Sequence, residues 1–315
     1  MLPESWPLVV IDLKGCFFTI PLHPADAPRF AFTVPAINNQ ESTLCFHWTV
    51  LPQGMLSSPT IRQMFVARAV LPICRAYPNA LIYHYMDDIL ISASSRDAVQ
   101  TVVKELRKSL SANGLCIAEE KVQVQAPWKY LGWKITDTAI LPQPLRLASD
   151  IKTLNDLQKL LGTINWVPPY LGITTQDLAP LFALLKGESD LASSRTLTPE
   201  ALHALQRVSA AIQNRQIHRI SPMFPVRLIL IYSVFQPYAL LCQWVSGDID
   251  PLRILEWVFL AHAFSRTVTT GIEMMVLLIQ KGRHRLQSLL AQDPASISIA
   301  LAKQDFNCMS RVLHR

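Results

Sequence analysis

The apolar positions in the first part of the chain predict β-strands with acids at their ends. Leu8–Ile11 is an uninterrupted apolar run that stops at Asp12, as expected for a short buried strand. Residues 81–91 form a second apolar stretch, which reads as a hairpin and carries Asp87 and Asp88 at its tip. Two adjacent like charges repel each other, and a hairpin turn needs neither of them. The presence of two adjacent acids at the hairpin tip therefore indicates a chemical role for them.

Helical periodicity is clearest at residues 94–114, where Ser94 or Ser95 can cap the helix and Gly114 can end it. Ser58 and Pro59 begin an earlier helix, which Pro72 is expected to kink or end. Other helices are predicted at Thr153–Trp166, Thr175–Leu185, Pro199–Asn214, Pro251–Phe264 and Gly282–Ala291. Other strands are predicted at Phe30–Val34, Phe46–Val50, Leu115–Ile117, Val122–Val124, Tyr130–Ile135, Val226–Tyr232 and Ala239–Val245.

This order of elements predicts an α+β protein in three parts. A sheet-and-helix domain is expected over residues 1–149, a helical domain over 150–219 and a mixed domain over 220–315. With 315 residues, half of them hydrophobic, the chain is long enough to bury several cores. The net charge of +6 permits a nucleic-acid partner, but an ordinary mildly basic globular protein would fit it equally well.

The cysteines and the chain start limit the cellular setting. No two cysteines have C-x-x-C spacing, which argues against a zinc site and a disulfide framework and suits a reducing compartment. The first residues do not resemble a signal peptide. Val226–Val245 is apolar but contains Arg227 and Gln236-Pro237, so it predicts two strands rather than a membrane span. We expect a cytoplasmic protein with no membrane partner.

Asp12, Asp87 and Asp88 converge if the first strand pairs with the hairpin. Such a cluster repels itself unless cations neutralise it, and hard oxygen ligands favour Mg²⁺, with Mn²⁺ as an alternative. Two such ions about 4 Å apart can clamp the attacking and leaving oxygens of a phosphoryl transfer. The alternative reading of an isolated Asp-Asp pair is a solvated turn.

The order of the motifs favours the metal site. "VVIDLKGCFFTIPL", "FAFTVPAINNQ", "WTVLPQGMLSSPTIRQMF" and "YHYMDDILI" resemble the palm of a retroviral reverse transcriptase in sequence and spacing. "YLGWKI" resembles its primer grip, "TLNDLQKLLGTINWVPPYLGI" resembles its thumb, and the remainder resembles the connection domain. The chain is most similar to the Pol polyprotein of endogenous betaretrovirus-like elements of the group K type. The resemblance implies a right-hand polymerase: an antiparallel palm sheet with helices on one face, a helical thumb and a mixed α/β connection domain.

The resemblance also implies a function and its partners. The chain would be an RNA-directed DNA polymerase that takes an RNA or DNA template with its primer and deoxynucleoside triphosphates, and it could form a dimer. Two Mg²⁺ ions would be held by the three catalytic carboxylates, Asp12, Asp87 and Asp88. Residues that resemble the nucleotide-binding set are Leu13, Phe17, Gln53, Gly54 and Met86. Residues that resemble the template–primer contacts are Tyr85, Leu131, Gly132, Gln158, Gly162 and Trp166.

Several of these assignments have a structural alternative. Phe17 would exclude the 2′-hydroxyl of a ribonucleotide by size, but one of Phe17 and Phe18 is expected to fill the core, and we assign that to Phe18. Gln53-Gly54 could be a simple turn. Gly162 could mark close helix packing instead of a nucleic-acid face. The core of that helix is assigned to the stripe Leu157, Leu160, Leu161 and Ile164.

The sequence also departs from the family pattern. Gly15 stands where related sequences have an Asp, and only eleven residues precede Asp12, so the fingers strands that carry the triphosphate-binding cations are expected to be missing. The acids after residue 220 show no ribonuclease H arrangement, so we expect that activity to be absent. A non-catalytic remnant, whether a nucleic-acid-binding scaffold or a decayed element, is therefore the alternative function. We expect the chain to bind primed nucleic acid weakly and to polymerise poorly or not at all.

Overall fold

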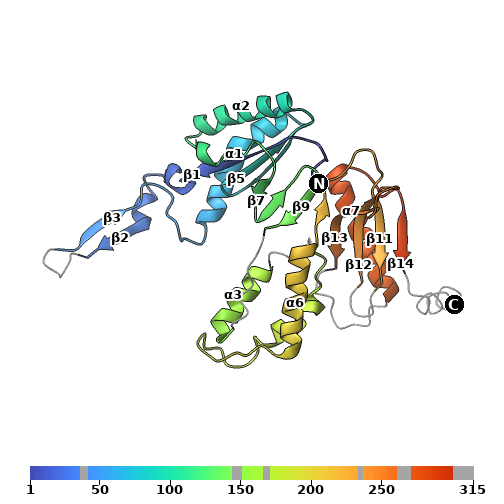
Figure 1. Ribbon diagram of the computed structural model, residues 1–315. Helices are drawn as coiled ribbons and strands as arrows, with labels where there is room; N and C mark the ends of the chain where they lie inside the picture. Colours follow the sequence, from blue (N-terminus) through green and yellow to red (C-terminus); the bar gives the residue numbers. More distant parts are fainter. Residues whose placement is uncertain (36–41, 144–150, 166–170, 233–236, 261–270, 301–315) are drawn as a thin grey trace.

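The computed structural model describes residues 1–35, 42–143, 151–165, 171–232, 237–260 and 271–300, which form a mixed α/β chain with mostly antiparallel sheets (Figure 1). The strands are β1 (Leu8–Lys14), β2 (Ala31–Val34), β3 (Leu44–His47), β4 (Leu81–Tyr85), β5 (Asp88–Ser92), β6 (Cys116–Ile117), β7 (Trp128–Tyr130), β8 (Trp133–Ile135), β9 (Ala139–Pro142), β10 (Ile217–His218), β11 (Arg227–Ile231), β12 (Tyr238–Trp244), β13 (Leu252–Phe259) and β14 (Ile297–Ala300). The α-helices are α1 (Ser58–Ala76), α2 (Arg96–Ala112), α3 (Leu154–Asn165), α5 (Thr175–Ala183), α6 (Pro199–Asn214) and α7 (Gly271–Leu290).

Strand β1 is buried on both of its faces, which explains its uninterrupted apolar run. Its sheet has the order β4-β5-β1-β6. Val9, Ile11 and Leu13 pack into one core with the apolar stripes of α1 and α2. Leu8 and Val10 point the other way and pack with Trp128 and Ile135 of the neighbouring β10-β9-β8-β7 sheet. The period of two along a strand therefore divides β1 between two cores.

Of the two predicted effects of Pro72, a kink or an end of the helix, the end does not occur in α1. It runs to Ala76, and Pro72 lies inside it. Val70 and Ile73, on either side of the proline, are both buried against the sheet. This packing holds the two sides in one helix despite the cost of a proline, which is about 3 kcal/mol in a helix interior.

The C-terminal part departs furthest from the expected elements. Residues 251–264 were predicted as a helix, but Leu252–Phe259 is the edge strand β13, and residues 261–264 lie outside the described ranges. Its pairing with β12 brings the rings of Tyr238 and Trp257 to 5.5 Å, so cross-strand packing decides the conformation. Helix α7 begins at Gly271, eleven residues before the predicted start, and packs on the β13-β12-β11-β14 sheet.

The first part of the chain differs from the predicted elements at residues 122–124 and at residues 130–135. Residues 122–124 were predicted as a strand, but only the isolated bridge between Val10 and Gln123 forms there, after a single 3₁₀ turn at Glu119–Lys121. The hairpin β2–β3 projects from the rest of the chain, and the residues of both of its strands are exposed (Figure 1). The short β7–β8 hairpin falls where the strand 130–135 was predicted, and it turns at Leu131-Gly132.

Helices α3, α5 and α6 pack around one apolar core. The predicted stripe of Leu157, Leu160, Leu161 and Ile164 is confirmed, since all four side chains are buried in it. Thr174 caps α5 and Thr198 caps α6, and each side chain accepts a hydrogen bond from the backbone three residues on. The helical part is thus specified locally by caps and by a stripe.

Leu205→Ala should destabilise this helical part by about 2–5 kcal/mol, because Leu205 is 5% exposed and its truncation leaves a cavity. Leu202→Ala, on the same helix but 43% exposed, is the matched control and should change stability by less than about 0.5 kcal/mol. Urea unfolding followed by circular dichroism compares the two. If Leu205→Ala lowers the free energy of unfolding as little as Leu202→Ala does, the structure closes around the smaller side chain and leaves no cavity.

The chain start and the end of the helical part are held together by Arg219, whose side chain is almost fully buried. Its Nη2 donates to the carbonyls of Pro3 and Trp6, at 2.5 and 2.7 Å, and its Nη1 donates to the carbonyl of Thr136 at 3.1 Å. Close by, β10 pairs with β9, so Ile217 and Ile140 are opposite each other. The base of the helical part is therefore fixed to the first two sheets.

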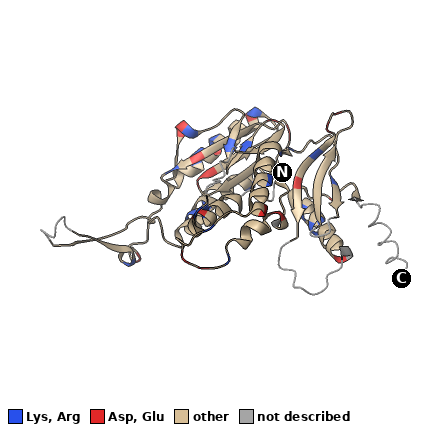
Figure 2. Cartoon of the chain, turned by 60° about the horizontal axis from the view of Figure 1, so that its bottom comes forward, with Lys and Arg blue, Asp and Glu red and all other residues tan. Residues whose placement is uncertain are grey.

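The surface charge is spread over the chain. Figure 2 shows Lys and Arg residues as well as Asp and Glu residues on elements of all three described parts. None of the helices in the described ranges combines the length and the apolar character needed to cross a bilayer.

Candidate active site

The three predicted carboxylates meet at one end of the first sheet. Asp12 lies directly opposite Asp88 in the antiparallel pairing of β1 with β5. Asp87 occupies the turn between β4 and β5, and its carbonyl accepts a hydrogen bond from the backbone N–H of Leu13 at 2.9 Å. The prediction that the first strand and the hairpin tip share one sheet edge is therefore confirmed.

The carboxylates influence each other's ionisation. Burial is the main cause that raises the pKa of Asp88 above its ordinary value, and the charges of Asp12 and Asp87 add to it. Burial also raises the pKa of Asp87, with a further contribution from Asp12, while Arg62 and Lys121 act in the opposite direction. The edge therefore concentrates negative charge that the fold alone does not fully stabilise.

Two cations of the chain face this edge. Arg62 Nη1 lies 3.0 Å from Asp87 Oδ2, and the Arg62 side chain is only 10% exposed. Lys121 Nζ lies 3.0 Å from Asp12 Oδ1, but its side chain is 61% exposed. In the first pair the cation is buried and the Asp87 side chain is 37% exposed, whereas in the second pair the cation itself is exposed.

Asp88→Asn should stabilise the first part of the chain at neutral pH. A carboxyl group whose pKa is raised by folding destabilises the fold once pH exceeds its ordinary value of 3.8, and this effect grows until the raised pKa is passed. The neutral amide removes that penalty. Because the site is partly open to solvent, we expect a gain of only about 1–2 °C in melting temperature at pH 7.

Scanning calorimetry at pH 7 and pH 3.5 tests this expectation. At pH 3.5 the carboxyl group is mostly protonated in both the folded and the unfolded states, so most of the gain should disappear. A gain of equal size at both pH values would assign it to packing and not to charge.

The hairpin tip is fixed by Gln63 of α1. Its Oε1 accepts a hydrogen bond from the backbone N–H of Met86 at 2.7 Å, and its backbone carbonyl lies 3.3 Å from Nε2 of His84. Met86 has a positive φ of 56°, which is uncommon for a residue other than glycine. Tyr85, the last residue of β4, is exposed. The tip is therefore a strained turn held by a helix, with Tyr85 and Met86 beside the carboxylates.

Phe18 does not fill the core as predicted, and Phe17 is the more buried of the two rings. Phe18 is 49% exposed and stacks on Trp48, so the assignment of Phe18 to the core is wrong. Phe17 is half-buried in the 3₁₀ turn Cys16–Thr19, with the Arg62 guanidinium 4.1 Å from the centre of its ring. The turn begins after Gly15, whose φ of 58° places Phe17 beside the carboxylate edge. Neighbouring residues on a tight turn point to different sides, which apolarity alone does not reveal.

The other predicted nucleotide-site residues differ in exposure. Leu13 is buried in the core, so its side chain cannot meet a nucleotide, and its N–H is already bonded to Asp87. Gln53 and Gly54 form an exposed turn, and Gly54 has a φ of 87° that suits glycine. Both the turn reading and the nucleotide reading of this pair remain compatible with that geometry.

The predicted template–primer residues fall on two surfaces. Leu131 and Gly132 both have positive φ and make the two-residue turn of the β7–β8 hairpin, where Leu131 is exposed. Gln158 and Gly162 lie on the exposed side of α3. No atom lies within 4 Å of a Cβ placed on Gly162, so close helix packing does not explain this glycine. Trp166 lies outside the described residues.

The sequence analysis missed Arg62 and Lys121. Arg62 stands four residues before Val66 on the buried face of α1, so an arginine in the apolar stripe was the available signal. Lys121 offered no local signal, because its contact with Asp12 spans 109 positions.

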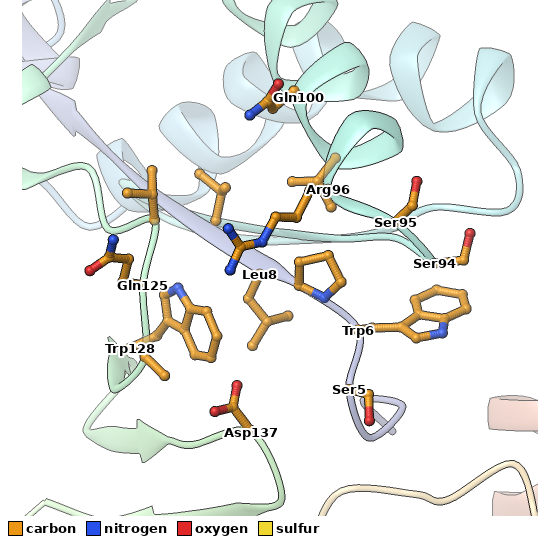
Figure 3. A pocket seen from close by; sticks show the side chains of 15 residues that line it. Ser5, Trp6, Leu8, Ser94, Ser95, Arg96, Gln100, Gln125, Trp128 and Asp137 are labelled. Atoms are coloured by element: carbon orange, nitrogen blue, oxygen red, sulfur yellow. The ribbon is translucent and has the colours of Figure 1, made fainter.

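A cavity lies elsewhere, away from the carboxylate edge. It has a volume of about 610 Å³ and lies between the start of β1, the start of α2 and β7, with Trp6, Leu8, Arg96, Trp128 and Asp137 around it (Figure 3). Leu8 and Asp12 are separated by four residues of extended strand, or about 13 Å. None of the predicted site residues lines this cavity.

The donor set at the carboxylate edge suits a hard divalent cation. Asp87 Oδ1 is buried without a hydrogen-bond partner, and a cation would satisfy it. Within the described ranges, however, no group of three or more His, Cys, Asp or Glu side chains is already placed to hold a metal ion. The residues fit Mg²⁺ by type and position, while two of the three carboxylates are engaged by Arg62 and Lys121.

Comparison with known families decides the assignment. Residues 1–135 match the family model of reverse transcriptase (RNA-dependent DNA polymerase), and residues 142–206 match that of the reverse transcriptase thumb domain. This part of the chain belongs to the reverse transcriptase family. Members of this family are nucleotidyltransferases that in general depend on divalent metal and use a template, a primer and nucleotides.

Retroviral relatives place this reverse transcriptase sequence within Pol. It is 39% identical over 98% of its length to the Gag-Pro-Pol polyprotein of mouse mammary tumor virus, and 42% identical over 95% of its length to that of squirrel monkey retrovirus. It is 42% identical over 81% of its length to a Pol-related polyprotein of the mouse intracisternal A-particle. The chain spans 17%, 16% and 30% of the length of these relatives.

The C-terminal part of the reverse transcriptase chain also has a match. Residues 234–312 match the family model of an ERVK-8-like, RNaseH-like domain. The expectation that a ribonuclease H region is absent is therefore not confirmed. In the structure, Asp248, Glu256 and Asp293 are each paired with an arginine.

Proposed function

We propose that this chain carries the polymerase centre of a retroviral Pol protein and joins deoxynucleotides to a primer on an RNA or DNA template. The observation that carries the proposal is the pairing of Asp12 with Asp88 across β1 and β5, with Asp87 beside them. Residues 1–149 would form the palm, 150–219 the thumb and 220–315 the connection domain. The matches to the reverse transcriptase and thumb families support the first two of these roles.

In this proposal each of the candidate site residues has a separate role in nucleotide transfer. Asp12, Asp87 and Asp88 would hold two Mg²⁺ ions, which when bound supply charge for activating the primer hydroxyl and for stabilising the phosphate. Phe17 would bound the sugar pocket and leave no room for a 2′-hydroxyl. Gln53 and Gly54 would border the nucleotide. Tyr85 and Met86 would meet the primer end.

The template–primer would lie across two exposed features. The Leu131-Gly132 turn presents backbone at the end of the β7–β8 hairpin, and the Gln158 and Gly162 side of α3 is open. Contacts of this kind fix the position of a duplex and carry little sequence information. Binding should therefore weaken as salt is added, whatever the template sequence.

The test is primer extension by the purified chain on a primed RNA template with Mg²⁺ or Mn²⁺, beside fluorescence anisotropy with the same primed template. Slow but metal-dependent extension is the expected result, in keeping with the weak polymerisation expected from the sequence. A chain that binds the primed template but extends it with neither metal would support the alternative of a non-catalytic nucleic-acid-binding protein. The ion pairs of Arg62 and Lys121 at the carboxylates are the observation that favours this alternative.

A further inference from the structure

Arg62 is an unusual member of the buried side of α1. It lies one turn before Val66 and is the charged member of a buried face that otherwise holds Ser58 and the apolar Val66, Ala69, Val70 and Ile73. Arginine is almost never buried unless it is paired. The partner that compensates Arg62 in this structure is Asp87, a proposed metal ligand.

The ion pair of Arg62 and Asp87 leaves a polar atom of each residue without a hydrogen-bond partner. One nitrogen of Arg62, Nη1, reaches one oxygen of Asp87, Oδ2, at 3.0 Å. The remaining Asp87 oxygen, Oδ1, and the Arg62 Nε are both buried without a partner. Arginine usually forms two parallel hydrogen bonds with a carboxylate, so this contact does not use the full geometry of either group. It leaves Asp87 with an oxygen that a second cation would satisfy.

Arg62 also contacts the proposed sugar pocket. Its guanidinium carbon lies 4.1 Å from the centre of the Phe17 ring. One side chain therefore joins the hairpin tip to the 3₁₀ turn that carries Phe17. Lys121 is different, because its exposed side chain can leave Asp12 by rotating into solvent. Arg62 can leave Asp87 only by giving up its contacts inside the molecule.

We propose that Arg62 is an internal counter-ion that competes with divalent metal for Asp87 and thereby weakens metal binding at the carboxylate edge. This inference rests on the proposed function, since it takes the three carboxylates as the metal site. Arginine keeps its charge at every pH that the fold withstands, so protonation cannot release the competition. The metal must instead displace the guanidinium from Asp87.

The experiment measures Mn²⁺ binding by electron paramagnetic resonance on the whole chain, without nucleotide or primer. Arg62→Met removes the guanidinium and keeps an unbranched apolar stem. Arg68→Met is the matched control, because Arg68 is exposed on the same helix and carries the same charge. An opposite charge within about 4–6 Å changes ionisation equilibria by one to three powers of ten, so we expect about tenfold tighter binding in Arg62→Met. Arg68→Met should bind as the unaltered chain does.

Asp87→Asn, added to both variants, identifies the site. It should remove the difference between Arg62→Met and Arg68→Met. If both variants and the unaltered chain bind Mn²⁺ equally at an Asp87-dependent site, the competition is refuted while the metal site stands. If none of them shows an Asp87-dependent site, the proposed function loses its metal site and the competition falls with it.

A measurement on the unaltered chain covers the case in which Arg62→Met does not fold. Phenylglyoxal modifies accessible guanidinium groups, and mass spectrometry of the peptides reports each arginine separately. Saturating Mn²⁺ should increase the modification of Arg62 severalfold and leave that of Arg68 unchanged. No increase at Arg62, with Mn²⁺ bound at the Asp87-dependent site, would overturn the proposal.

Discussion

Asp87→Asn should lower the single-turnover rate of primer extension by about a thousandfold, the upper range for the loss of one electrostatic stabiliser in an active site. The substitution keeps the shape of the side chain and removes the charge that the metals would need. The backbone carbonyl of residue 87 still accepts the hydrogen bond from Leu13, so the turn should persist. The expected loss is therefore chemical, with the fold retained.

The control for this substitution is Asp97→Asn, which removes the same charge from an exposed position in the first turn of α2. It should leave the extension rate within about twofold, as expected for a surface charge away from the site. Melting curves of both variants show whether either loses structure. Extension by Asp87→Asn at the rate of the Asp97 control would remove the carboxylate from the mechanism.

Phe17→Val should let the enzyme incorporate ribonucleotides about 10–200 times more readily relative to deoxynucleotides, the range that pocket size alone can supply. The ring lies on the 3₁₀ turn directly after β1, and the Arg62 guanidinium covers it. A smaller side chain would open the space that a 2′-hydroxyl needs. The ratio of kcat/KM for a matched ribonucleotide and deoxynucleotide on one template measures the effect.

Phe18→Val provides the comparison, because it makes the same change at the neighbouring position. Phe18 is exposed and stacks on Trp48, away from Arg62. Its replacement should leave the ratio unchanged. If Phe17→Val also leaves it unchanged, Phe17 supports the turn and does not select the sugar.

The sequence predicted those features that local chemistry determines. The apolar run ending at Asp12, the cap at Ser95 and the stripe beginning at Leu157 each depend on residues within a few turns or strands of one another. The meeting of Asp12 with Asp88 needed only one further assumption, that the first strand pairs with the hairpin. The main part of the candidate site was therefore predictable.

What could not be predicted depends on partners distant in sequence. Strand β13 reads as a helix by itself, and it becomes a strand because β12 offers a paired edge and aromatic neighbours. Arg62 is compensated by an aspartate 25 positions away, and Lys121 by one 109 positions away. The burial of Phe17 and the exposure of Phe18 follow from one turn whose direction is set by Gly15.

The pairing of β9 with β10 has a consequence for how this architecture can change over evolutionary time. The chain leaves the second sheet after β9 and returns to it as the adjacent strand β10, so Ile140 and Ile217 end up as cross-strand partners. The segment between them, which includes α3, α5 and α6, leaves and rejoins the sheet at two adjacent strands. Segments with neighbouring ends can be lengthened, replaced or lost without rethreading the remaining sheet. The helical part is therefore a module that could be exchanged without changing the strand pairing that brings Asp12 opposite Asp88.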